Sequence, residues 1–457
     1  MSRDINRREF VAAAGAAGIV GVAGCVGSPE GGGGTETEGE SGGMETTAAG
    51  TTAGGMGGGP EMLVVIGYPE SGIQLFRDYY SMTGGDEHDV LVPDGLQDAS
   101  LPGQVGNDMS NVTGTAPAAG GPNQEAFNGL YQDEYGSAPG VFTSQSYDSV
   151  ALLILANAAA GENTGSAIRD QMRRIANPGG TSYGPQDFLA AVEAAANGED
   201  INYQGASSTT NFNAAGDPAS AAYQIWRFKG QNADSVETVE TQSFQGENPK
   251  GAGPAADSAP GGMGRELSVG ILLPQTGDLA SVGGPMIQAA QLPVKQVNDS
   301  DLDLTVNAQV EDTQTSPSSG VTAAESLASA GVPAVCGSAS SGVNVPVSKQ
   351  VFIPNQMVGC SPSSTALSVT NLEDDDYIFR TAPSDILQGR VMAQVASDRL
   401  GNSSASTLYV NNDYGQQLSN RFTEVFENSF GGEVLRQVGF NKGASSYTSA
   451  LETALSG

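Results

Sequence analysis

Residues 267–277 read LSVGILLPQTG, an apolar run of strand length that ends in a turn rich in polar residues and glycine. Short apolar runs recur along the chain, and amphipathic stretches of helical period lie between them. Strands that alternate with helices over short connections are typical of α/β proteins with parallel, doubly wound sheets. Ligands of such sheets bind at the loops that leave the carboxyl ends of the strands. We therefore expect an α/β fold whose site lies on these loops.

Two globular segments, 61–230 and 265–457, carry this alternation. Strands are predicted at 62–67, 90–93, 223–229, 267–273, 304–310, 334–336, 356–359, 407–410 and 433–440. Among the helices, the clearest are predicted at 72–81, 146–159, 185–197, 320–330, 388–400 and 447–455. The turns that follow several predicted strands are rich in Ser, Thr and Gly. Their hydroxyls and backbone amides suit a carboxylate or an amide of a ligand.

The charge balance excludes several classes of function. The chain has 51 acidic and 19 basic residues, for a formal net charge of −32. Binding to nucleic acid needs clustered Lys and Arg, so no nucleic-acid partner is expected. An acidic surface of this kind suits a protein that stays soluble in high salt, although an ordinary acidic secreted protein is the alternative. With His88 as the single histidine, catalytic triads and metal clusters that depend on several imidazoles are excluded.

The first 25 residues resemble an export signal rather than part of the fold. Arg7 and Arg8 are similar to a twin-arginine motif, and the apolar run 11–23 after them is too short to span a bilayer. The run ends at Cys25 in a sequence that resembles a lipobox, which implies lipid attachment there; a plain signal peptide is the alternative. Residues 26–60 are predicted to be a disordered tether, and 231–264 a second flexible linker, because both segments hold little that could be buried.

Several motifs, taken together, resemble a known family. They occur at 269–274, 338–342, 361–365, 379–389 and 409–415, and then at 64–70, 93–96, 142–156 and 216–226. In this order the chain is similar to the type 1 periplasmic binding proteins of the branched-chain amino acid class, which are receptors of ATP-driven importers. The resemblance covers nearly all of 61–457, but the second half of the family pattern precedes the first.

A circular permutation accounts for this order, whereas the alternative is two incomplete, unrelated α/β domains. The linker 231–264 would then join the usual ends of the family fold, and a flexible segment of that length can bridge them. The permutation predicts that the strand at 62–67 lies in the same sheet as the strand at 407–410.

The resemblance implies a two-lobed fold in which each lobe is a doubly wound, mostly parallel sheet flanked by helices. Several strands would cross between the lobes as a hinge. Segment 265–390 would form lobe 1 and 391–457 would begin lobe 2. Segment 61–230 would supply the rest of lobe 2, except for helices around 121–204 that belong to lobe 1.

The same resemblance implies a site for an amino acid. Glu70 would neutralise the ammonium group, although a glutamate at a helix start is also favourable to the dipole. The ligand carboxylate would be bound by hydroxyls that otherwise cap turns, and the ligand side chain would be covered by tyrosines that otherwise only pack. The hydroxyls are those of Ser340, Ser341, Ser363 and Thr365, and the tyrosines are Tyr68 and Tyr414.

The implied function is extracytoplasmic capture of an amino acid, most simply a branched-chain one, for an ABC permease. The protein would sit on the outer face of the cell membrane through the lipid on Cys25. No enzyme activity and no cofactor are expected. A ligand sensor of the same fold, for signalling or for amides and urea, is the alternative. Cys336 and Cys360 would end neighbouring strands, either as a disulfide or as two buried thiols.

Overall fold

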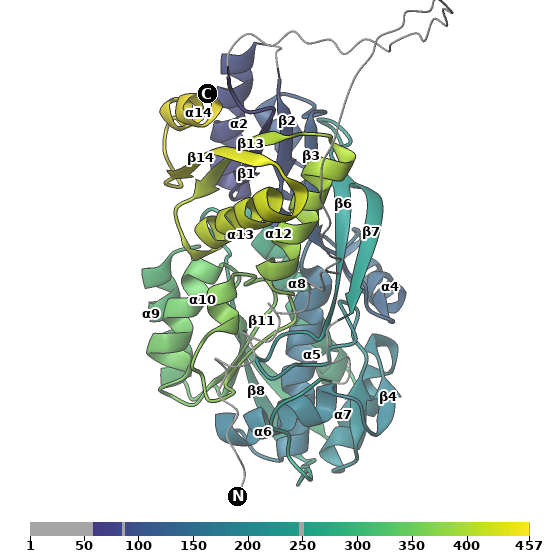
Figure 1. Ribbon diagram of the computed structural model, residues 1–457. Coiled ribbons are helices and arrows are strands. Elements are labelled where there is room, and N and C mark those ends of the chain that lie inside the picture. The colour runs from purple at the N-terminus through teal and green to yellow at the C-terminus, as the bar shows by residue number, and fades with distance from the viewer. Residues whose placement is uncertain (1–57, 85–86, 246–250, 457) are drawn as a thin grey trace, which may run out of the picture. The chain divides into compact units, whose positions relative to one another are not determined.

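The computed structural model of the protein contains two large β-sheets, each flanked by helices (Figure 1). It describes residues 58–84, 87–245 and 251–456. The predicted signal at 1–25 with Cys25, and almost all of the predicted tether at 26–60, lie outside these residues. The α/β class with mostly parallel sheets, expected from the alternation of apolar and amphipathic runs, is confirmed.

The five-stranded sheet has the order β12-β11-β10-β8-β9, and all its pairs are parallel. Counted along the chain from β8, this order is 2-1-3-4-5, a doubly wound arrangement whose switch point lies between its first and third strands. The strands are β8 (Arg265–Leu273), β9 (Leu304–Asp312), β10 (Ala334–Gly337), β11 (Val358–Ser361) and β12 (Ile378–Arg380).

The seven-stranded sheet has the order β14-β13-β1-β2-β3-β6-β7. Its first five strands are parallel, and β6 and β7 add an antiparallel edge. The parallel part again has the order 2-1-3-4-5, but only if β13 is counted first and β14, β1, β2 and β3 follow. The strands are β1 (Met62–Ile66), β2 (Asp89–Val92), β3 (Val112–Pro117), β6 (Ser220–Arg227), β7 (Glu237–Gln245), β13 (Ser404–Val410) and β14 (Glu433–Phe440).

The pairing of β1 with β13 joins segments that are far apart in the sequence. The two strands run parallel in register from Met62 opposite Ala405 to Ile66 opposite Tyr409, and in Figure 1 the purple β1 lies beside the yellow-green β13. The prediction that these strands share a sheet is therefore confirmed. A side chain at Gly59 would come within 2.8 Å of the Leu455 carbonyl oxygen, so the end of α14 (Thr448–Leu455) also touches the approach to β1.

Helix α5 (Thr143–Ala160) is buried along its whole length because almost every residue is apolar or small. It contacts β8, β10 and β11, and three helices pack beside it, namely α6 (Gly165–Ala176), α7 (Phe188–Ala196) and α8 (Ala280–Asn298). Segments from both halves of the sequence therefore form the layer around the five-stranded sheet.

The other helices are α2 (Pro69–Thr83), α3 (Leu101–Val105), α4 (Gln124–Tyr135), α9 (Pro317–Ser329), α10 (Ser341–Val347), α11 (Leu367–Thr370), α12 (Asp385–Gln394) and α13 (Asp413–Phe430). Strands β4 (Thr181–Tyr183) and β5 (Ile201–Tyr203) form a separate small sheet. In the described ranges, no helix combines the length and apolar character that crossing a membrane requires.

The segment 231–264 differs from the flexible linker that the sequence predicted. Residues 237–245 form β7 beside β6, and Phe244 packs edge-on against Tyr223 with ring centroids 5.9 Å apart. Farther on, the Ala256 and Gly261 amides donate to backbone carbonyls of the α5–α6 region, at 3.0 and 2.8 Å. The composition predicted disorder because the segment has few large apolar residues, whereas most of its contacts with neighbouring elements are backbone hydrogen bonds.

Cys336 and Cys360 end neighbouring strands and face each other in register, as the sequence predicted. Of the two alternatives left open for this pair, the structure has buried free thiols. Burial raises the pKa of Cys336 to about 12, so this thiol stays protonated near neutral pH.

Cleaving the chain within 246–250 should leave its two pieces associated, since each piece contributes strands to the seven-stranded sheet. An inserted protease site and gel filtration of the cut protein test this expectation. The uncut protein carrying the same insertion is the control. Pieces that elute separately without denaturant would show that the shared sheet does not hold them together.

Candidate functional site

A pocket lies where loops of the two sheets meet, at the carboxyl ends of their parallel strands. About 390 Å³ of space lies between its lining atoms, a volume that includes the solvent-open side of the pocket. Loops after β8, β10 and β11 line one side, and loops after β1, β2 and β13 line the other. The lining residues are Tyr68, Asp94, Gly95, Phe142, Pro274, Leu279, Val282, Gly283, Met286, Ala339, Ser340, Ser341, Ser363 and Tyr414.

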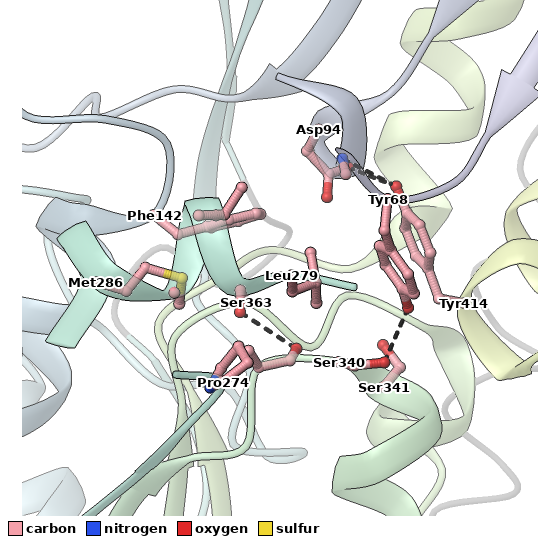
Figure 2. Close-up of a pocket in the computed structure, with 14 residues that line it drawn as sticks. Tyr68, Asp94, Phe142, Pro274, Leu279, Met286, Ser340, Ser341, Ser363 and Tyr414 are labelled. Carbon is pink, nitrogen blue, oxygen red and sulfur yellow. Dashed lines mark hydrogen bonds between the residues drawn. The ribbon is translucent and has the colours of Figure 1, made fainter. Parts of the chain in front are cut away.

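Two stacked tyrosines form one wall of the pocket (Figure 2). The rings of Tyr68 and Tyr414 are 5.7 Å apart and nearly parallel. Their hydroxyls point to opposite ends: that of Tyr68 hydrogen-bonds the Ser340 hydroxyl at 2.8 Å, and that of Tyr414 donates to Asp94 at 3.3 Å. Burial raises the pKa of both phenols, so each remains a hydrogen-bond donor near neutral pH. The wall therefore spans the pocket and offers an apolar face with a polar group at each end.

Asp94 is the acidic group of the pocket. It begins a short turn directly after β2 and is only 4% exposed. Its Oδ1 accepts from Gln388 Nε2 at 2.6 Å, and no ion pair of the described residues involves it. Burial raises its pKa to about 6. At neutral pH the site thus holds a buried carboxylate without a cationic partner, which is costly unless a ligand brings one.

Gly95 allows the backbone to pass close behind this carboxylate. A side chain at Gly95 would come within 2.4 Å of the Gly67 carbonyl oxygen and 3.0 Å of the Tyr414 hydroxyl. The sequence Asp94-Gly95 after β2 therefore permits a turn tight enough to hold Asp94 against both Tyr414 and α12.

Serine hydroxyls gather at the opposite end. Ser340 is the residue before α10, and Ser341 accepts from the Ala366 amide at 3.2 Å. Ser363 donates to the Ala339 carbonyl at 3.2 Å. The loop with Ser340 and Ser341 follows β10 at the switch point, and the loop with Ser363 follows the neighbouring β11. Their hydroxyls, with the start of α10, favour a negatively charged group.

Apolar side chains close the remaining side. Phe142 stands at the start of α5 with φ of 59°, a left-handed conformation that is unusual for a bulky residue and turns its ring into the pocket. Leu279, Val282 and Met286 come from the start of α8. Gly283 lets helix α8 lie close to the loop after β8, because any larger residue at this position would collide with the Pro274 carbonyl oxygen.

A buried ion pair holds the loop after β11, which carries Ser363 and is called the serine loop below. Arg380 is fully buried and holds Asp217 with two hydrogen bonds of 2.6 and 2.9 Å. The same guanidinium donates to the carbonyls of Ser364 and Ala366, at 2.9 and 3.1 Å. Arg380 therefore fixes the loop after β11, on which Ser363 lies.

At the rim of the pocket, contacts join the two sides directly. The Ser71 hydroxyl of α2 donates to both carboxylate oxygens of Asp278, at 2.6 and 2.8 Å, and Lys442 donates to the Thr315 carbonyl. These bonds tie the loops after β8 and β9 to α2 and to the loop after β14.

The pocket includes five of the seven ligand-binding residues predicted from the sequence. Tyr68, Ser340, Ser341, Ser363 and Tyr414 all line it. The other two, Glu70 and Thr365, are not among the lining residues.

Glu70 is an exposed residue in the first turn of α2 and does not line the pocket. Because Pro69 starts the helix directly after Tyr68, the next side chain turns outward. Burial raises the pKa of Glu70, and the nearby Asp278 carboxylate adds to the effect. Thr365 is fully buried but is also absent from the lining.

Sequence reasoning missed Asp94, Phe142, Leu279, Val282 and Met286. Asp94 had a visible signal, since an acid between Pro93 and Gly95 directly follows a predicted strand. The four apolar residues had none that separates a pocket wall from an ordinary core.

Comparison with known proteins gives a family for part of the chain. Residues 266–456 match the family described as periplasmic binding protein. The Leu/Ile/Val-binding protein homolog 1 of Brucella abortus is 29% identical over 192 residues, which cover 41% of this chain and 50% of the relative. The chemotactic signal transduction system substrate-binding protein BasB of Halobacterium salinarum is 27% identical over 205 residues, covering 42% of this chain and 48% of BasB.

Among solved structures, the leucine binding protein LivK of Thermotoga maritima aligns with a TM-score of 0.38 and 24% identity. The alignment covers 41% of this chain and 53% of LivK. The chain spans about half the length of the curated relatives that it matches. The matched family and the names of these relatives describe binding proteins rather than enzymes.

Replacing Arg380 with Met should lower the free energy of unfolding by about 3–5 kcal/mol, because Asp217 would remain buried without its partner. Arg421→Met is the matched control: Arg421 pairs with the exposed Glu424, and losing that pair costs at most about 1 kcal/mol. Denaturant unfolding of both variants in one buffer measures the difference. Equal losses in the two variants would refute the anchoring role of Arg380.

Proposed function

We propose that the protein is an extracytoplasmic substrate-binding protein of the type 1 periplasmic class, which captures an amino acid and delivers it to an ABC permease. The observation that carries the proposal is the charge arrangement of the pocket. A buried carboxylate without a cation lies at one end, and serine hydroxyls with a helix N-terminus lie at the other. A zwitterion matches both ends at once.

The ligand would lie along the tyrosine wall. Its ammonium group would be the cationic partner of Asp94, and its carboxylate would be bound by Ser340, Ser341 and Ser363. This arrangement assigns to Asp94 the role that the sequence suggested for Glu70. The apolar wall of Phe142 and the α8 side chains favours an aliphatic or aromatic ligand side chain. The names of the Leu/Ile/Val-binding relatives agree with that class.

Capture would require the two sheets to move apart and close again about the segments that cross between them. The rim bonds of Ser71 and Lys442 would belong to the closed state, and a ligand that contacts both sides stabilises that state by its differential affinity. The residues before α12, which follow β12, are one such crossing.

We further propose that the chain is a circular permutant of the family. The strand order 2-1-3-4-5 of the seven-stranded sheet is recovered only by counting from β13 through the far end of the sequence to β1. The family match covers residues 266–456, and the segment with β1, β2 and β3, which shares a sheet with β13, lies outside it. Attachment to the outer face of the membrane through Cys25, with export by the twin-arginine route, completes the proposal.

A sensor is the second candidate, favoured by one observation. The relative in Halobacterium salinarum is named as part of a chemotactic signal transduction system. The same pocket would serve either role, so the membrane partner distinguishes them. Co-purification of a permease supports transport, whereas co-purification of a signal transducer supports sensing.

Asp94→Asn should weaken binding of leucine, isoleucine or valine by about 10²–10³-fold, because the ammonium would lose its charged partner while the shape stays the same. Glu70→Gln is the matched control and should change the affinity by less than about threefold, since its side chain is exposed. Calorimetric titration measures both. If Glu70→Gln loses binding and Asp94→Asn does not, the assignment of the acid is reversed; if neither does, the ligand carries no ammonium.

Affinity for a zwitterion should be constant from about pH 8 to pH 7 and fall below about pH 6. The pKa of Asp94, raised to about 6 by burial, sets this limit, because only the ionised carboxylate attracts an ammonium group. Asp148 of α5 has a pKa raised by burial to a similar value, so the titration must be repeated with Asp94→Asn. The fall in affinity should vanish in that variant, and its persistence would assign the effect to another group.

A further inference from the structure

A second group of buried polar atoms lies next to the pocket, around the start of α12. Asp385 and Gln388 belong to α12, Thr365 follows β11, and Thr115 lies in β3. Asp385 is 2% exposed and the other three are fully buried. None of the four lines the ligand pocket, so the proposed function leaves them without a role.

These side chains share a shortage of hydrogen-bond partners. Both carboxylate oxygens of Asp385 lack a partner, as do the side-chain oxygens of Thr365, Gln388 and Thr115. The Thr365 hydroxyl faces Asp385 and stabilises its charged form, but no hydrogen bond of normal geometry joins them. An unpaired buried polar atom is unfavourable, so five of them in one place require an explanation.

Backbone and side-chain contacts make these residues neighbours. The Asp385 amide donates to the Thr365 carbonyl at 2.9 Å, and Gln388 lies one turn later on the same face of α12. The Gln388 amide nitrogen is oriented by Asp94 at 2.6 Å and lies 3.5 Å from the Thr115 carbonyl. A carboxylate can only accept, so the nitrogen must face Asp94 and the Gln388 oxygen is left free.

Among the described residues, no ion pair involves Asp385. Arg380 is close enough to favour its charged form, but the guanidinium is occupied by Asp217 and by carbonyls of the serine loop. Burial raises the pKa of Asp385 well above its usual value, and repulsion from Asp94 adds to the effect. The carboxyl group therefore needs either a proton or a positive ion.

The donors determine which kind of ion fits. All of them are oxygens, which hard cations prefer, and neither nitrogen nor sulfur is offered. The described residues contain no cluster of three or more Asp, Glu, His or Cys that could hold a metal, and one carboxylate among neutral oxygens balances a single positive charge. We propose that Asp385, Thr365, Gln388 and Thr115 bind an alkali-metal cation beside the ligand pocket.

The site goes beyond the proposed function and is coupled to it through one residue. The side-chain oxygen of Gln388 would bind the ion, while its side-chain nitrogen donates to Asp94. The ion thus fixes the orientation of the acid that faces the ligand, and it ties α12 to the loop after β11.

Thermal unfolding of the full chain in NaCl, KCl and choline chloride, at equal concentration, tests the proposal. Choline keeps the ionic strength but is too large for the site. The midpoint should be higher in NaCl or KCl than in choline chloride by at least about 2 °C. Asp385→Asn should abolish this difference, whereas the matched control Asp133→Asn, an exposed acid on α4, should keep it.

Equal midpoints of the wild type in all three salts would overturn the proposal, as would a difference that persists in Asp385→Asn. Asp385→Asn also mimics a protonated acid. If the wild type shows no preference among cations and this variant is as stable, a proton occupies the position instead. Should Asp385→Asn fail to fold, Thr365→Val removes one ligand without touching the charge, and it must reduce the difference between salts.

Discussion

The parallel pairing of β1 with β13 is the constraint on which the rest of the molecule depends. It joins the two ends of the described chain into one sheet, and it brings the loop with Tyr68 beside the loop with Tyr414. The stacked tyrosines then form a wall that reaches from Asp94 to Ser340. Both sheets have their switch points at this wall, so the geometry of doubly wound sheets concentrates the polar groups of the site there.

The distribution of charge in the site would set the orientation of a bound ligand. Asp94 is desolvated, hydrogen-bonded to Gln388 and without a cation, whereas Arg380 close by is fully engaged with Asp217. Arg380, one of two fully buried arginines among the described residues, thus has a structural role, whereas in the proposed function Asp94 is left for the ligand. Helix α12 joins these regions, because Gln388 donates to Asp94 and the Asp385 amide donates to the Thr365 carbonyl after β11.

The sequence predicted the α/β class, the strands that carry the site, and the five pocket residues that lie directly after strands. The sequence did not predict which way a side chain points within its loop. Glu70 and Asp94 both follow strands, and only the start of α2 at Pro69 turns the first outward while the turn at Gly95 turns the second inward. Phe142 reaches the pocket through a left-handed backbone that no local signal indicates, and β7 depends on a neighbouring strand rather than on its composition.

Mass spectrometry of the solute that co-purifies with the protein tests the central claim most directly, because a pocket complementary to a zwitterion should retain one during purification. Protein purified without denaturation, at a pH well above the pKa of about 6 of Asp94, should release an α-amino acid with an apolar side chain in stoichiometric amount. Asp94→Asn protein should release little of it. A stoichiometric solute without an amino group, retained equally by Asp94→Asn, would contradict the account.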